Sequence, residues 1–148
     1  MVTRDDIIRE ARALIGVPFL HQGRDRVLGL DCVGVLAAVA DALEIPHSDD
    51  LTYELRANDS GVLRRVLIES ACVEVPIDLS RHGDILTFWY ERKGCEYHAG
   101  FLATDRGRPT VIHALPHPGT REVTLSDRWR SRMIAQFTPP GFPAEVAA

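Results

Sequence analysis

The chain has 148 residues, of which 45% are apolar and 26% charged, so the composition is that of a globular protein and excludes a disordered or fibrous one. This length matches one typical domain, and we assign residues 1–148 to a single domain. A formal net charge of -4 leaves no basic excess and argues against a nucleic-acid partner. The basic stretch at 128–132 is therefore interpreted as a solvated edge.

The start of the chain carries no recognisable targeting signal. The segment MVTRDDIIRE is charged from Arg4 onward and lacks the apolar run of about 7–15 residues of a secretory signal. No stretch reaches the roughly 18 consecutive apolar residues of a membrane span. We therefore expect synthesis in the cytoplasm and no membrane insertion, with export only if another assembly carries the protein out.

Helical spacing marks the first half of the chain. Thr3 and Asp6 form a capping-box pattern before an apolar stripe that ends by Gly16. After a loop rich in glycine and arginine, apolar residues from Cys32 to Leu43 repeat at i, i+3, i+4, i+7 and i+11, which predicts a second helix. A shorter helix is predicted at 61–70.

The second half consists of short runs rich in β-forming residues, separated by turn residues. These predicted strands are 71–75, 84–90, 97–104, 110–115 and 132–138. Asp84 is interpreted as a turn residue that begins one of them. Helices followed by strands predict an α+β fold in which N-terminal helices pack on a C-terminal antiparallel sheet. The proline-rich tail at 139–148 is expected to be extended or frayed.

Three cysteines without a CxxC pair fit neither a disulfide scaffold nor a zinc ribbon. Cys32 follows Asp31, a natural N-cap, at the start of the second predicted helix, where unpaired N–H groups and the helix dipole favour a thiolate. This position predicts a nucleophile with a pKa well below about 8.5. The alternative is that Cys32 only extends an apolar stripe. Cys72 and Cys95 lie away from helix starts and are assigned structural roles.

Two histidines flank a predicted hairpin turn. With a two-residue turn at 105–106, His98 lies directly opposite His113, and with a four-residue loop at 105–108, His98 pairs with Leu115. Strand alternation puts both imidazoles on one face in either register, on strands about 4.8 Å apart. Together with the thiol they supply a nucleophile, a base and an orienting group, provided that the rings do not lie on the far side of the sheet from the sulfur.

Two other interpretations of the histidines remain open. Each ring alone can satisfy a hydrogen bond in the core, and His113 with His117 has the HxxxH spacing of a zinc site. Pro116 and Pro118 prevent the helix that this spacing requires. We therefore predict no metal and no cofactor.

Four segments, in order, resemble the NlpC/P60 family of cysteine peptidases, specifically its short members found with phage tails and gene-transfer agents. ARALIGVPFLHQGRDRVLGLDCVGVLAAV is similar to the family's first helix, its G-x-P-[aromatic] turn and its D-C-x-G nucleophile helix. RHGDILTFW is similar to its G-D strand, and YHAGFLATDRGRPTVIHAL to its two histidine strands. WRSRMIAQFTPPGF is similar to the closing segment of the tail-associated group.

The resemblance implies a papain-like α+β fold in circularly permuted order. It also implies hydrolysis of amide bonds in peptidoglycan stem peptides, often between γ-D-glutamate and diaminopimelate. By position, Cys32 matches the nucleophile, His98 the base and His113 the third polar residue of a Cys-His-His triad. We assign four further residues to substrate binding: Phe19, His21, Gln22 and Asp31. The implied partners are the stem peptide and phage-like tail proteins, with delivery in a phage-like particle.

Two departures from the family pattern bear on specificity. Val33 replaces a common serine and Phe19 a common tyrosine, so a hydroxyl and a phenol are missing, and His21, Gln22 or Arg24 are the available polar substitutes. Two other functions stay open: a tail-assembly module with weak or no catalysis, and a Cys-His amidase or acyltransferase acting on another amide or thioester. Intracellular recycling of wall peptides fits the chain's start equally well.

Overall fold

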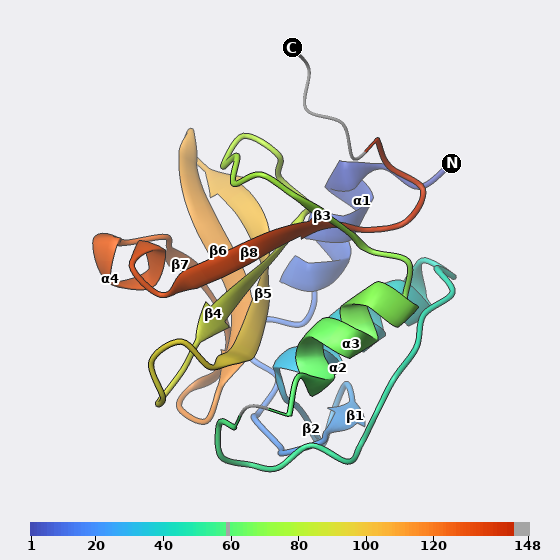
Figure 1. The fold of residues 1–148 in the computed structure, drawn as a ribbon. Coiled ribbons are helices and arrows are strands. Elements are labelled where there is room, and N and C mark those ends of the chain that lie inside the picture. Colours follow the sequence, from blue (N-terminus) through green and yellow to red (C-terminus); the bar gives the residue numbers. More distant parts are fainter. Residues whose placement is uncertain (59, 144–148) are drawn as a thin grey trace.

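The computed structural model describes residues 1–58 and 60–143, with helices first and a large sheet after them (Figure 1). The helices are α1 (Arg4–Arg12), α2 (Cys32–Ala42), α3 (Val62–Glu69) and the short α4 (Asp127–Arg130). The small strands β1 (Arg24–Asp25) and β2 (Gly29–Leu30) pair just before α2. The main sheet contains β3 (Val73–Val75), β4 (Ile85–Trp89), β5 (Glu96–Asp105), β6 (Arg108–Leu115), β7 (Gly119–Thr124) and β8 (Met133–Thr138).

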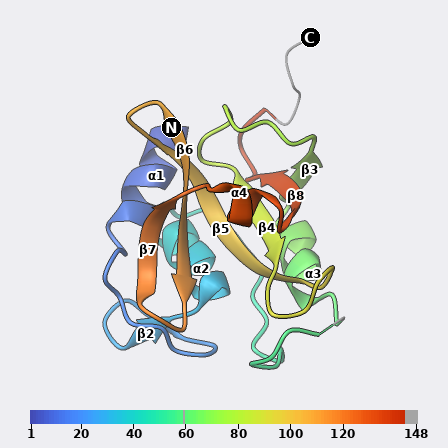
Figure 2. The ribbon, with the colours of Figure 1, turned by 90° about the vertical axis from the view of Figure 1, so that its left-hand side faces the viewer.

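The main sheet is antiparallel throughout, in the order β3-β8-β4-β5-β6-β7. Helices α1, α2 and α3 cover one face, where Phe101 and Ile112 join the larger apolar cluster. The neighbours Leu102 and Val111 point to the other face and belong to a smaller cluster, against which Trp129 of α4 packs. Figure 2 looks onto this second face, with α4 in front. The predicted α+β arrangement is confirmed.

Local signals place the starts of α1, α2 and α3 correctly, but the β1–β2 pair, β7 and α4 were not predicted. The hydroxyl of Thr3 accepts from the N–H of Asp6 and the Asp6 carboxylate accepts from the N–H of Thr3, which is the predicted capping box. Strand β7 was missed because its sequence, GTREVT, lacks a regular apolar alternation. The α4 turn overlaps the basic stretch at 128–132, so that stretch is in part an ordered element.

The segment after β8 returns over α1. Phe142 packs against the larger cluster, with the guanidinium carbon of Arg4 5.3 Å from its ring centre. The carbonyl of Pro143 accepts a hydrogen bond from Arg81. Residues 139–143 of the predicted tail are therefore packed, and 144–148 lie outside the described residues.

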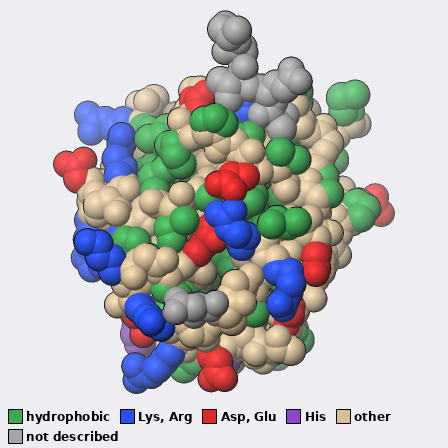
Figure 3. All heavy atoms as spheres, viewed as in Figure 1, with side chains coloured by type: hydrophobic (Ala, Val, Ile, Leu, Met, Phe, Trp, Pro, Cys, Tyr) green, Lys and Arg blue, Asp and Glu red, His purple; other side chains and the backbone are tan. Residues whose placement is uncertain are grey.

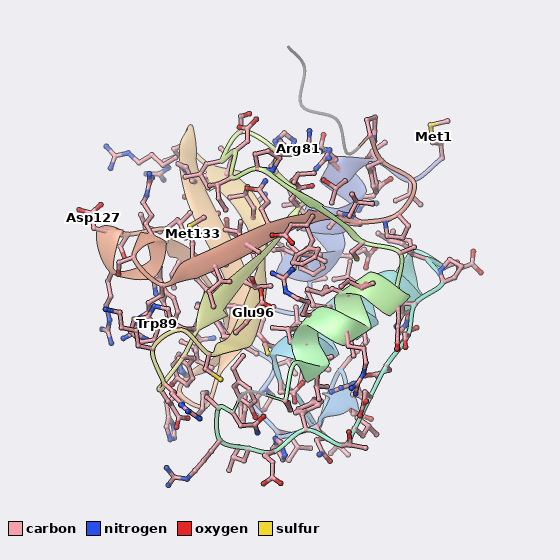
Figure 4. All side chains as sticks on the ribbon, viewed as in Figure 1. Met1, Arg81, Trp89, Glu96, Asp127 and Met133 are labelled. Carbon is pink, nitrogen blue, oxygen red and sulfur yellow. The ribbon has the colours of Figure 1, made fainter. Side chains whose placement is uncertain are left out.

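The surface carries mixed charges. Acidic and basic side chains are interspersed over the face in Figure 3. One local example is Arg64, which forms ion pairs with Glu74 at 2.6 Å and with Glu96 at 2.7 Å (Glu96 is labelled in Figure 4). None of the helices in the described part of the chain is long and apolar enough to cross a bilayer.

Candidate active site

Helix α2 begins at Cys32, and Asp31 is its N-cap, as predicted. Asp31 Oδ1 accepts from the N–H of Gly34 at 2.8 Å, which satisfies one of the free donors of the first turn. The half-buried Cys32 lies beside the remaining donors at the positive end of the helix. Its Sγ is 3.9 Å from the carbonyl oxygen of Tyr97, so the start of α2 meets the start of β5.

Two glycines allow the preceding loop to pack onto the first turn of α2. A Cβ on Gly34 would lie 2.1 Å from the carbonyl oxygen of Gly23, and a Cβ on Gly23 would lie 2.4 Å from that of Gly29. Both distances are far below any tolerated carbon–oxygen contact. The glycine of the D-C-x-G segment thus has a packing cause, because it lets the β1–β2 region touch the helix that carries the cysteine.

The Asp31 carboxylate is 3% exposed and collects hydrogen bonds from three segments. Its donors are the N–H of Gly34 (2.8 Å), the N–H of Gln22 (2.8 Å), the Arg24 guanidinium (2.9 Å) and the Tyr53 hydroxyl. Tyr53 was not predicted. It comes from the loop between α2 and α3 and brings a phenol to the site although Phe19 replaces the tyrosine of the turn. A single phenol in the otherwise polar stretch 47–60 is the signal that was overlooked.

The two histidines form a pair. In the pairing of β5 with β6, Phe101 lies opposite Ile112, and the pairing continues to the hairpin tip at 106–107. This register is the one predicted with the four-residue loop at 105–108. Nε2 of His98 lies 2.7 Å from Nδ1 of His113. A Cβ on Gly100 would lie 2.9 Å from that of His113, so the glycine leaves room for the second ring.

The imidazoles lie on the sheet face away from α1, α2 and α3. Ala99 and Ala114 belong to the helix-side cluster, so their neighbours His98 and His113 point to the other face. There the Trp129 ring centre is 5.7 Å from that of His98 and 4.9 Å from that of His113. Both rings therefore lie on the face that α4 covers, and the approach of His98 to the sulfur stays a prediction.

The residues of the site surround a cavity of about 370 Å³, and the sulfur of Cys32 meets β5 near the start of that strand. Both Cys32 and His98 line this cavity. Its walls also include Phe19, His21, Asp31, Tyr53, Tyr90 and Tyr97. Its size is in the usual range for a small-molecule or peptide side-chain site. Three of the four residues assigned to substrate binding therefore line the cavity.

Gln22, the fourth residue assigned to substrate binding, binds two residues of the cavity wall. Its Nε2 donates to the carbonyl of Tyr53 at 2.9 Å, and its backbone N–H binds Asp31. The His21 ring contacts the Tyr53 ring edge-to-face, with centres 5.5 Å apart. The loop between α2 and α3 is thereby attached to the segment that precedes the cysteine.

The cysteine is protonated in the free site. Burial raises the pKa of Cys32 to about 12, and the charge of Asp31 acts in the same direction. The N–H groups of Ala99 and Val33 and the charge of Arg24 lower this pKa by less. The predicted pKa below about 8.5 was therefore wrong, because desolvation outweighs the helix terminus.

The two imidazoles are neutral for the same reason. Burial, followed by the charges of His113 and Arg132, lowers the pKa of His98 well below 6.5. Burial lowers the pKa of His113 to about 4. The site therefore holds a thiol and two neutral imidazoles.

Other residues discussed from the sequence lie outside this cavity. Cys72 is half-buried and Cys95 is buried. Asp84 is more than a turn residue, since it is fully buried and binds Arg4, Arg81 and Gln136. Among the described residues, no group of three or more His, Cys, Asp or Glu side chains is placed to hold a metal ion.

Comparison with known proteins adds the class of fold. No protein-family model matches the chain, and no curated protein matches it. The NlpC/p60 domain of the peptidoglycan hydrolase SagA is 25% identical with a TM-score of 0.61, over 93% of this chain and 99% of that one. An NlpC/P60 family protein from Bacillus cereus is 18% identical with a TM-score of 0.65, over 91% of this chain but only 39% of its own length. The chain has the NlpC/P60 fold, as its sequence resemblance predicts.

Proposed function

We propose that the chain is a cysteine endopeptidase that hydrolyses peptidoglycan stem peptides at a γ-D-glutamyl-diaminopimelate bond. The observation that carries the proposal is the cavity shared by Cys32, at a helix start, and His98, which is hydrogen-bonded to His113. The likeness to a domain of a peptidoglycan hydrolase supports the substrate class.

In the proposed reaction His98 acts as a general base during attack, since the free site holds a thiol and neutral imidazoles. Its Nε2–H donates to Nδ1 of His113, which leaves Nδ1 of His98 unprotonated to take the thiol proton. The sulfur bonds to the carbonyl carbon as this proton leaves. His98 then protonates the departing amine, and water attacks the thioester with His98 again as base.

The backbone N–H of Cys32 is the proposed donor to the oxyanion, because it lies in the first turn of α2. One such donor is worth about 2.7–4 kcal/mol of transition-state stabilisation. Phe19, His21 and Tyr53 are the proposed substrate contacts from the wall of the cavity. Asp31 and Gln22 act mainly by holding that wall and the helix start in place.

The decisive test compares two cysteine variants on purified muropeptides, with products identified by mass spectrometry. Cys32→Ala is expected to abolish cleavage while circular dichroism and the unfolding temperature stay close to wild type. Cys72→Ala, the matched control in a half-buried position outside the cavity, is expected to keep wild-type activity. A Cys32→Ala protein as active as wild type would exclude the mechanism.

We further propose that the protein acts with phage-like tails, on the sequence likeness of its closing segment at 129–142 to the tail-associated group. Co-purification with neighbouring tail proteins is the test. A wild-type protein that binds tail proteins and leaves every stem peptide intact would instead support an assembly module. Cleavage of other amides or thioesters only would support a different acyl-transfer substrate.

A further inference from the structure

We propose that Arg24 is a positioning residue for the nucleophile, which compensates the charge of Asp31 and fastens the loop wall of the cavity to the start of α2. This inference rests on the proposed function and deepens it. Arg24 lies on β1, eight positions before the cysteine, and three of its guanidinium nitrogens bind side chains from two other segments.

The first part of the argument concerns charge. Asp31 is buried next to Cys32, so a thiolate forming on the sulfur would face a neighbouring carboxylate anion. Nη1 of Arg24 lies 2.9 Å from Oδ1 of Asp31, with side chains 20% and 5% exposed. At such low exposure the ion pair is screened little by solvent. The guanidinium therefore offsets the repulsion between Asp31 and the reacting sulfur.

The second part concerns geometry. Nε and Nη2 of Arg24 bind the two carboxylate oxygens of Asp49 at 2.8 and 2.9 Å. Nη2 also donates to the Tyr53 hydroxyl at 2.9 Å, and the guanidinium carbon lies 5.8 Å from the Tyr53 ring centre. Tyr53 forms part of the cavity wall. One side chain thus joins the hairpin, the N-cap of α2 and the loop that closes the cavity.

The titratable groups facing the sulfur come from three parts of the fold. The helix start contributes Asp31, β1 contributes Arg24, and β5 contributes Tyr97. Of these groups, Arg24 is the permanent cation that binds Asp31. Its removal therefore changes the local charge in a defined direction.

The test uses alkylation of Cys32 by iodoacetamide, followed from pH 6 to 10 by peptide mass spectrometry, which needs no substrate. Arg24→Met is expected to slow alkylation about three- to tenfold at a fixed pH. The plot of alkylation rate against pH should shift toward higher pH. Asp31→Asn should instead speed alkylation, because the anion beside the sulfur is gone, and Arg24→Met should still slow alkylation in that background, because the guanidinium charge also acts on the sulfur directly. Arg26→Met is the control, since Arg26 is 45% exposed on the same hairpin and contacts Glu10 at 4.0 Å.

Arg24→Lys distinguishes the charge role of Arg24 from its role in positioning the loop. This variant also tests the proposal if Arg24→Met does not fold. Lysine keeps the charge but cannot bind Asp31 and Asp49 in the same fork, so alkylation should stay within about twofold of wild type while KM for the stem peptide rises. An alkylation rate in Arg24→Met equal to that of wild type at every pH would overturn the charge role. An unchanged KM in Arg24→Lys would overturn the loop role. A wild-type protein without peptidase activity would refute the proposed function and leave the alkylation result intact.

Discussion

Cys32 and Cys72 are both half-buried and both lie near a buried aspartate, yet their surroundings differ in kind. Burial raises the pKa of Cys72 to about 11, and the charge of Asp84 adds to this. At Cys32 the same two causes act, with Asp31 as the anion, but two backbone N–H groups and the Arg24 guanidinium oppose them. Of the two, Cys32 lines the cavity that His98 also lines.

For a thiol beside an aspartate, the surroundings therefore depend on which other groups face the sulfur. Asp84 forms ion pairs with Arg4 of α1 and with Arg81. Figure 4 shows Arg81 at the same end of the molecule as Met1, whereas β1 and β2 lie at the opposite end in Figure 1. The Asp84 cluster therefore connects α1 to the sheet, and the Asp31 cluster connects the start of α2 to the segments that line the cavity.

The test of this contrast with the greatest change in rate is loss of the imidazole of His98, the histidine that lines the same cavity as Cys32. His98→Ala should lower kcat/KM for stem peptides about 10²–10⁴-fold, since a general base contributes on that order. Cleavage of a defined stem peptide measures it. His117→Ala, at an exposed position of the β6–β7 turn, is the control and should leave the rate unchanged. A His98→Ala enzyme within tenfold of wild type would break the contrast between the two cysteines.

A second test removes the charge at the other aspartate. Asp84→Asn should lower the free energy of unfolding by about 2–4 kcal/mol, because Arg4 and Arg81 lose a buried counter-ion. Chemical denaturation measures the loss. The alkylation rate of Cys32 in the folded variant should equal that of wild type. A changed rate at Cys32 would mean that the two clusters are coupled.

The third effect concerns the paired imidazoles, which make the free energy of unfolding depend on pH. Because the folded pKa of His113 is about 4 and the unfolded value is near 6.5, the unfolded chain binds the proton first as pH falls. Stability is therefore greatest above about pH 6.5 and declines toward pH 4, by about 3 kcal/mol for His113 alone. The lowered pKa of His98 acts in the same direction.

Urea unfolding at several pH values between 7 and 4.5 measures this decline. His113→Asn should flatten the curve, because the amide does not titrate in this range. Replacement of His117 by glutamine should leave the slope unchanged, since this residue is exposed and lies outside the buried histidine pair. A wild-type curve that is flat over this range would contradict the burial of neutral imidazoles.

Features that depend on residues near one another in the chain could be predicted from the sequence. The cap at Asp31, the helix start at Cys32 and the capping box at Thr3 are examples, because each is decided within one helical turn. The pairing of His98 with His113 followed from strand alternation across one hairpin. The class of fold followed from the order of helices and strands and from the motifs.

The surroundings of Asp31, Cys32 and the two histidines depend on tertiary packing. It brought Tyr53 to Asp31 and Trp129 against the two histidines, and it put the imidazoles on the face away from the helices. The protonation of Cys32 is likewise a tertiary property. Helix caps and strand alternation act over a few bonds, whereas desolvation and packing depend on segments far apart in the chain, which no local pattern specifies.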